Sequence, residues 1–108
     1  LPFDFYITKL NLVIENDGKQ HFSPSWPFNF EQIRIHDKIK NEYCRSKGVH
    51  LLRIAYTQYR NMETIITNFI KEVEQSQKPL IKFVGPQYDK IENFPLPKKI
   101  NIVLKQKP

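Results

Sequence analysis

The sequence predicts one α/β domain, in which helices pack against a β-sheet. Two observations carry this prediction. Two short strand-like segments open the chain, and helix-like and strand-like segments alternate after them. The 108 residues are 40% hydrophobic and 26% charged, a composition that builds one core in a length too short for two.

The first two strands are predicted to form a hairpin. Residues 3–7 alternate and are aromatic, and residues 10–15 have an apolar interior. The link Thr8-Lys9 is short enough for a two-residue hairpin turn. Asp17-Gly18 gives a turn signal after the second strand, and residues 22–29, with two prolines and two serines, form a loop.

A helix is predicted from about residue 30 to residue 47, ended by Gly48. Its thin apolar stripe consists of Ile35, Ile39 and Tyr43. A neighbouring stripe, with the spacing i, i+3 and i+7, holds Asp37, Lys40 and Cys44. Because this helix must pack near the hairpin, the second stripe is a candidate rim for a site there.

The remaining segments complete the α/β pattern. Residues 49–56 predict a third, mostly buried strand. Residues 62–75 predict the clearest helix, because apolar residues at helical spacing give it one broad face. These are Met62, Ile65, Ile66, Phe69, Ile70 and Val73. Residues 80–84 and 100–104 predict two further strands, separated by a proline-containing loop.

The formal net charge of +6 favours a polyanionic partner, and most of the excess lies near the C-terminus. Residues 78–108 carry seven lysines against two acidic residues, whereas residues 1–77 are nearly balanced. We therefore divide the chain into a core, residues 1–77, and a basic C-terminal extension, residues 78–108. The extension is a solvated tail, an added edge strand or an arm that binds the nucleic-acid backbone.

Several classes of protein are disfavoured by the sequence. The apolar runs are too short for a transmembrane helix, and no signal-peptide pattern is present. The single cysteine, Cys44, cannot form an internal disulfide, which favours an intracellular location, and we expect it to be a small buried hydrophobe rather than a zinc ligand. Motifs of NTPases, dehydrogenases and serine hydrolases are absent. Since the chain begins at Leu1, we expect a fragment.

Asp4 and Glu15 are predicted to form a carboxylate pair. With a two-residue turn, Asp4 lies opposite Val13 and Glu15 is its diagonal neighbour on the same face of the sheet. Two carboxylates at one sheet end repel each other unless a cation lies between them, and hard divalent ions prefer such oxygen ligands. The alternative is a pair of solvated acids at a strand end.

His21 lies in the loop after the second strand. A histidine in a loop is more often a surface residue, but beside a carboxylate pair it is a candidate acid or base, because its pKa lies near neutrality. Asp37 and Lys40 are either a solvated pair on the helix or part of the rim of the same site.

Four segments together resemble a known family of nucleases. They are Leu1-Pro2-Phe3-Asp4-Phe5-Tyr6-Ile7, the stretch from Leu12 to Phe22 with its Glu-x-Asp-Gly-x-Gln-His string, the stretch from Asp37 to Cys44, and the strand from Gly48 to Tyr56. As a set, they are similar to the very-short-patch-repair-like (Vsr-like) and homing-type endonucleases of the PD-(D/E)XK superfamily. The resemblance covers about residues 1–75.

The resemblance implies a restriction-endonuclease-like mixed sheet flanked by helices, with a metal at the sheet end. Asp4 would match the metal-binding aspartate and Glu15 the second acidic position of the Asp…Glu-x-Lys pattern. His21 would match an active-site histidine and Asp37 a late aspartate. Lys40 and Arg53 are secondary candidates near the same end of the sheet.

The sequence also departs from the family. Asp17 stands at the position of the superfamily lysine, so Lys19, Gln20, His21 or Lys40 would have to supply that charge. A glutamate-bearing helix and the first core strand would lie upstream of Leu1, so the fragment is expected to lack both.

The function expected from these residues is metal-dependent hydrolysis of DNA phosphodiester bonds. Mg²⁺ or Mn²⁺ would be held by Asp4 and Glu15, and His21 would move a proton. The residues expected to contact DNA are Lys19, Arg53, Lys98 and Lys99. The alternatives are a nuclease-like domain that binds nucleic acid without cutting it, and a protein-interaction domain. The target sequence, the biological role and the oligomeric state stay open.

Overall fold

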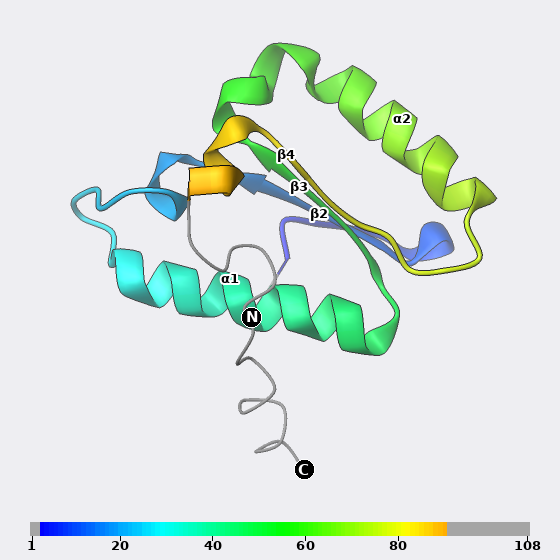
Figure 1. Ribbon diagram of the computed structural model, residues 1–108, viewed down its shortest axis with the longest axis horizontal. Coiled ribbons are helices and arrows are strands. Elements are labelled where there is room, and N and C mark those ends of the chain that lie inside the picture. Colours follow the sequence, from blue (N-terminus) through cyan, green and yellow to red (C-terminus); the bar gives the residue numbers. More distant parts are fainter. Residues whose placement is uncertain (1–2, 91–108) are drawn as a thin grey trace.

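The computed structural model describes residues 3–90, which form a four-stranded mixed sheet between two helices (Figure 1). In chain order the elements are β1 (Phe5–Ile7), β2 (Leu12–Asp17), α1 (Phe30–Lys47), β3 (His50–Ala55), α2 (Met62–Gln75) and β4 (Ile81–Val84). Four short 3₁₀ turns, Thr8–Leu10, Lys19–His21, Tyr56–Asn61 and Pro86–Lys90, join or follow them. The α/β architecture expected from the sequence is therefore confirmed.

The order of the strands across the sheet follows the chain, β1-β2-β3-β4. β1 runs antiparallel to β2, whereas β2, β3 and β4 are parallel to one another. Parallel neighbours need crossover connections, and α1 and α2 supply them. The two helices lie on opposite faces of the sheet (Figure 1). Alternate side chains of β2 and β3 therefore face different helices.

The hairpin register differs from the predicted one. Ile7 pairs with Leu12, and Phe5 pairs with Ile14, because the turn is longer than two residues. The chain between the strands forms a 3₁₀ turn and then Asn11, whose φ of 51° is left-handed. Continued by one residue, this register sets Asp4 across from Glu15 rather than across from Val13.

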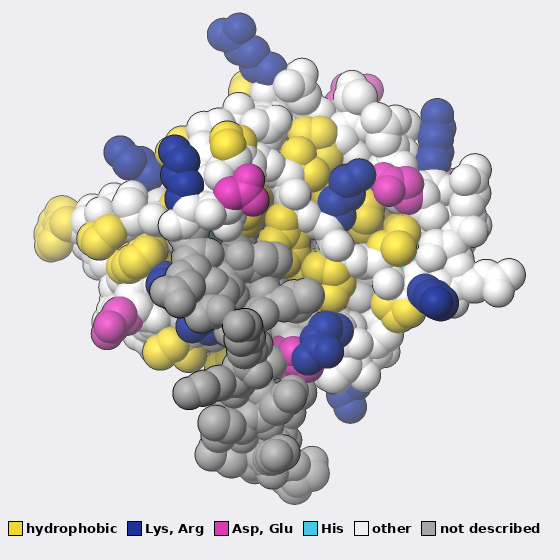
Figure 2. Space-filling model, in the orientation of Figure 1, with side chains coloured by type: hydrophobic (Ala, Val, Ile, Leu, Met, Phe, Trp, Pro, Cys, Tyr) yellow, Lys and Arg dark blue, Asp and Glu magenta, His cyan; other side chains and the backbone are white. Residues whose placement is uncertain are grey.

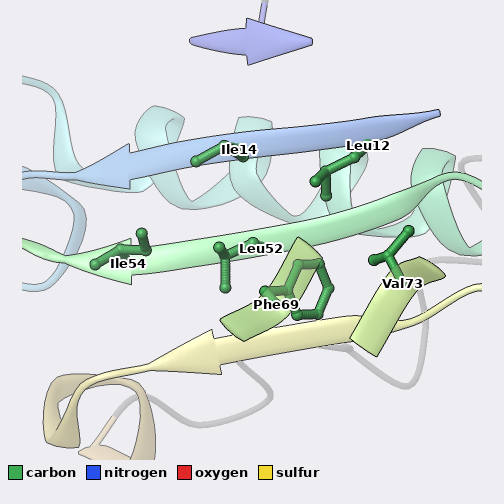
Figure 3. Packing of buried hydrophobic residues seen from close by; sticks show 6 residues of the cluster. All are labelled: Leu12, Ile14, Leu52, Ile54, Phe69 and Val73. Atoms are coloured by element: carbon green, nitrogen blue, oxygen red, sulfur yellow. The ribbon is translucent and has the colours of Figure 1, made fainter. Parts of the chain in front are cut away.

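The face of the sheet toward α2 carries the main apolar core (Figure 3). Its buried members are Leu12, Ile14, Leu52, Ile54, Phe69 and Val73. The other apolar residues of α2, which are Met62, Ile65, Ile66 and Ile70, are partly buried against them. The predicted helix 62–75 and its apolar face are thus confirmed.

The face of the sheet toward α1 is unlike a usual core. Three of the four buried residues of α1 are polar, and the fourth is Cys44. The apolar stripe predicted for this helix lies away from the sheet, since Ile35 is 54% exposed and Tyr43 is 41% exposed. The polar stripe that contains Asp37 and Lys40 lies toward the sheet instead. At the N-terminus of α1, the Asn29 side chain accepts a hydrogen bond from the N–H of Gln32. At its C-terminus, Gly48 has a left-handed φ of 72°.

Part of the C-terminal extension belongs to the sheet. β4 pairs with β3, and Tyr88 in the turn that follows is buried. The expected strand 100–104 and the expected DNA-binding residues Lys98 and Lys99 lie outside the described residues. Among residues 3–90, neither helix has the length and apolar character that crossing a membrane requires.

Candidate active site

Glu15 on β2 is the common partner of Lys40, which comes from α1, and of the backbone of Asp4, the residue before β1. We call Asp4, Glu15 and Lys40 the edge group. Glu15 is buried, and Lys40 Nζ donates to its Oε1 atom at 2.8 Å. The backbone N–H of Asp4 donates to the other oxygen, Oε2, at 2.7 Å. Asp4 Oδ2 in turn accepts a hydrogen bond of 2.8 Å from the backbone N–H of Asn16. The carboxylates of Asp4 and Glu15 are thus anchored to opposite strands of one hairpin.

Lys40 supplies the cation that the strand itself lacks. On β2 itself, the residue two positions after Glu15 is acidic, Asp17. Lys40 comes from α1 and still reaches Glu15, and its ammonium also lies 5.6 Å from the centre of the Phe3 ring. The side chain is mostly buried, at 16% exposed. Of the cations considered from the sequence, Lys40 is the one that the structure pairs with Glu15.

A second group of polar side chains surrounds the guanidinium of Arg53. We call Asp17, Asp37, Asn41 and Arg53 the buried clamp. Arg53 Nη1 donates to both carboxylate oxygens of Asp17, at 2.9 and 3.0 Å. Its Nε donates to Asn41 Oδ1 at 2.6 Å, and Nη1 lies 3.5 Å from Asp37 Oδ1. The four residues are all buried, so the clamp is a desolvated charge network.

The burial of Arg53 contradicts the expectation that this residue contacts DNA. The Arg53 side chain is 0% exposed, and its donors point to acceptors inside the protein. Burial alone would lower the pKa of Arg53, but the charges of Asp17 and Asp37 outweigh it and raise the pKa above its ordinary value. Arg53 therefore stays positively charged and binds acceptors inside the protein.

Tyr88 completes the clamp from the end of the described chain. Its hydroxyl donates to Asp17 Oδ2 at 2.7 Å, and its ring stacks edge-on against Phe22 at 5.0 Å. Burial, followed by the negative charge of Asp17, raises the pKa of Tyr88 well above its ordinary value. The hydroxyl consequently keeps its proton and remains a donor.

His21 belongs to the clamp side of the site. It lies in the 3₁₀ turn after β2, where its Nδ1 is 2.7 Å from Asp37 Oδ2 and 3.6 Å from Asp17 Oδ1. The described contacts thus join His21 to Asp17 and Asp37, whereas Glu15 is joined to Lys40 and to the backbone N–H of Asp4. Glu15 and Asp17 are two residues apart on β2, so the edge group and the clamp are neighbours on one face of the sheet.

The charge balance of the two groups depends on His21. The two groups contain four carboxylates, those of Asp4, Glu15, Asp17 and Asp37, against the two cations Lys40 and Arg53. Burial acts to lower the pKa of His21, but the hydrogen bond to Asp37 and the charges of both aspartates outweigh it and raise the pKa above its ordinary value. When protonated, His21 adds a third cation and reduces the excess of acidic groups.

The raised pKa of His21 predicts a pH dependence of stability. A histidine whose pKa rises on folding stabilises the protein fully below its unfolded pKa of about 6.5, and this contribution is lost as the pH rises through the folded pKa. We expect the difference in unfolding free energy between the wild type and His21→Gln to shrink from pH 5.5 to pH 8.5, a range chosen around that value. Urea unfolding at several pH values measures it.

His50 offers a control of opposite sign. Burial lowers the pKa of His50, and its Nδ1 accepts a hydrogen bond from the backbone N–H of Leu80. Relative to His50→Gln, the wild type should therefore lose stability as the pH falls below about 6.5. A stability difference for His21→Gln that stays constant with pH, or that runs in the same direction as the one for His50→Gln, contradicts the assignment.

Two other chemistries fit the described site poorly. Burial raises the pKa of the Cys44 thiol to about 11, so this cysteine is a thiol near neutral pH, as expected for a small buried hydrophobe. Ligand atoms of Asp17, His21 and Asp37 lie within 4.8 Å of one another, which is a metal-like geometry. However, Arg53 is already paired with both aspartates, and a dication there would lie beside a buried guanidinium.

The sequence analysis did not identify Asn41 or Tyr88 as site residues. Asn41 shares the inward stripe of α1, four residues after Asp37, and that spacing could have identified it. Tyr88 is 71 residues from its partner Asp17, and no local pattern joins the two. The pairing of Asp17 with Arg53 became visible only once β2 and β3 were placed side by side.

Comparison with known proteins places the chain in a family without assigning its chemistry. No curated protein and no solved structure matches it. One family model, described as a family of unknown function (DUF5889), matches residues 1–94. Since this match covers most of the 108 residues, the chain belongs to the DUF5889 family.

Proposed function

We propose that this domain is a divalent-metal-dependent endonuclease that hydrolyses DNA phosphodiester bonds. The observation that carries the proposal is the contact of Lys40 with Glu15, beside Asp4. Two carboxylates and a lysine then stand together as in the Asp…Glu-x-Lys pattern of PD-(D/E)XK nucleases, which the sequence resembles. The lysine comes from the helix after the strand, and Asp17 at the usual position binds Arg53 instead.

Asp4 and Glu15 are the residues to which we assign the metal ion. Their side chains offer only oxygen donors, which suit Mg²⁺ or Mn²⁺. Asp4 is exposed, and only its Oδ2 atom has a hydrogen-bond partner among residues 3–90, so the other oxygen is available to a ligand. When bound, the ion would polarise the scissile phosphate and lower the pKa of a water molecule.

Lys40 and His21 have separate roles in the proposed reaction. The water oxygen bonds to phosphorus and gives up its proton, the bond from phosphorus to the leaving oxygen breaks, and that oxygen takes a proton. Lys40 places a positive charge beside Glu15, where it stabilises the negative charge that develops on the phosphate. His21 is the candidate proton donor to the leaving oxygen, because the hydrogen bond to Asp37 and the charges of Asp17 and Asp37 raise its pKa above the ordinary value and favour the protonated imidazole.

Binding of the DNA backbone is proposed to come from dispersed cations. Lysine and arginine side chains are spread over the face in Figure 2, among hydrophobic patches. Lys19 is exposed and lies in the same 3₁₀ turn as His21, so it remains a candidate for a phosphate contact. Phosphate contacts of this kind add affinity without sequence specificity and weaken with salt.

Plasmid nicking with Mg²⁺ or Mn²⁺ tests the proposal. We expect the wild type to cut, and Asp4→Asn, Glu15→Gln and Lys40→Met each to lower the rate at least about 100-fold, since each removes a charge at the reacting phosphate. Glu63→Gln is the control, because Glu63 is an exposed carboxylate in the first turn of α2, the helix on the opposite face of the sheet. It should cut like the wild type.

Three outcomes would contradict the proposal, and each has its own meaning. Cutting that survives EDTA excludes the metal mechanism. Binding of duplex DNA without cutting, in both metals, favours the alternative of a nucleic-acid-binding domain that lacks catalysis. Absence of DNA binding at moderate salt favours a protein-interaction domain.

A further inference from the structure

The buried clamp and the edge group are connected through α1. Asp37 is three residues before Lys40 on this helix, and Asn41 is the residue directly after it. By helical spacing, Asp37 shares a face of the helix with Lys40, three residues later, and with Asn41, four residues later, so the two flank it on the side toward the sheet. The guanidinium of Arg53 contacts both, through Asn41 Oδ1 and through the side chain and backbone oxygens of Asp37.

Arg53 is also at the level of Glu15 in the sheet. The parallel register of β2 and β3 pairs Glu15 with Arg53 directly. From that position its side chain extends to Asp17, two residues along β2, and to the two residues of α1. One buried side chain thus joins the strand that carries Glu15 to the turn of helix that carries Lys40.

Few apolar contacts hold α1 against the sheet near Lys40. Cys44 is the one buried apolar residue of α1 in the described structure, and it lies one turn beyond Lys40. Apolar packing tolerates small sliding motions, whereas hydrogen bonds to a planar guanidinium fix both distance and direction. The position of α1 at the level of Lys40 is therefore set by polar contacts.

We infer that Arg53, bound by Asp17, Asp37 and Asn41, is the positioning residue that fixes the Lys40 ammonium against Glu15. This inference rests on the proposed function for its catalytic consequence, but the placement of Lys40 is a structural statement in its own right. Arg53 itself stays inside the protein and does not touch the substrate. Its effect reaches the phosphate through Lys40.

Two clamp variants test the inference. Arg53→Lys keeps the positive charge but loses the fork of donors, and Asn41→Leu keeps the side-chain volume but removes one acceptor. In each, the nuclear Overhauser effect between the Lys40 ε-protons and the Phe3 ring should be lost, because the Lys40 ammonium lies 5.6 Å from the centre of that ring in the intact protein and should move away when the clamp is broken. We expect kcat per folded molecule to fall roughly 10- to 100-fold with KM for duplex DNA nearly unchanged.

Phe69→Leu is the matched control for lost stability. Phe69 is buried on the opposite face of the sheet, so this variant is destabilised without any change at the clamp. A merely structural role for Arg53 lowers the folded fraction, measured by circular dichroism, and leaves kcat per folded molecule as in Phe69→Leu. The control should keep both the Overhauser effect and kcat.

The results separate this inference from the proposed function. If the wild type does not cut DNA, the nuclease proposal fails, and the Overhauser effect still decides whether the clamp positions Lys40. If the effect persists in both clamp variants, or if kcat per folded molecule matches the control, the positioning role is wrong. If Arg53→Lys does not fold, Asn41→Leu decides by the same two measurements.

Discussion

Replacing Arg53 with methionine should lower the free energy of unfolding by about 3–5 kcal/mol. Methionine fills a similar space, but it leaves the buried carboxylates of Asp17 and Asp37 without their shared cation. Uncompensated buried charges are costly because water is excluded from them. Since native proteins are stable by only about 5–15 kcal/mol, this loss is a large fraction of the total free energy of unfolding. Urea denaturation followed by circular dichroism measures the change.

The exposed pair of Lys82 with Glu72 provides the matched control. The Nζ–Oε2 distance is 3.0 Å, similar to the 2.9 Å between Arg53 and Asp17 in the clamp, but the side chains of Lys82 and Glu72 are about half exposed. Lys82→Met should therefore cost less than about 1 kcal/mol, because solvent screens surface ion pairs. A loss for Arg53→Met as small as the one for Lys82→Met would show that the clamp does not hold the fold together.

Truncation of Phe69 to alanine should cost about 3–5 kcal/mol. Phe69 is 1% exposed and packs between α2 and the sheet, against the apolar side chains of β2 and β3 (Figure 3). Removing the ring loses its transfer free energy and leaves a cavity that rigid strands cannot close. The same denaturation experiment measures the change.

Asn68→Ala is a suitable comparison, since Asn68 precedes Phe69 on α2 and is exposed. Exposed helix positions of this kind change stability by only about 0.5 kcal/mol in either direction. A loss below about 1 kcal/mol for Phe69→Ala would mean that this face of α2 is not the core. Together, Arg53→Met and Phe69→Ala compare a polar contact on one face of the sheet with an apolar contact on the other.

The pairing of Asp4 with Glu15 illustrates how sequence reasoning was partly right. The alternating pattern predicted both strands and their antiparallel pairing. The register was wrong by two residues, because Asn11 adopts a left-handed conformation that the pattern did not reveal. The longer turn brings Asp4 to the position across from Glu15, where the two were expected only as diagonal neighbours.

The sequence by itself determined the elements and the apolar face of α2, because hydrophobic periodicity reports directly which side of an element avoids water. It also indicated Asp4, Glu15, His21 and Lys40 as candidate site residues. For α1 the thin apolar stripe does not mark the side that faces the sheet, because most of the buried residues of this helix are polar.

Tertiary structure alone decided which charges neutralise one another. Asp17 could be matched with Arg53 only after β2 and β3 lay side by side, and Lys40 with Glu15 only after α1 was docked across the sheet. Coulombic partners act through space and carry no periodicity along the chain. Burial then turns these pairings into large energies, because the interior screens charge far less than water does.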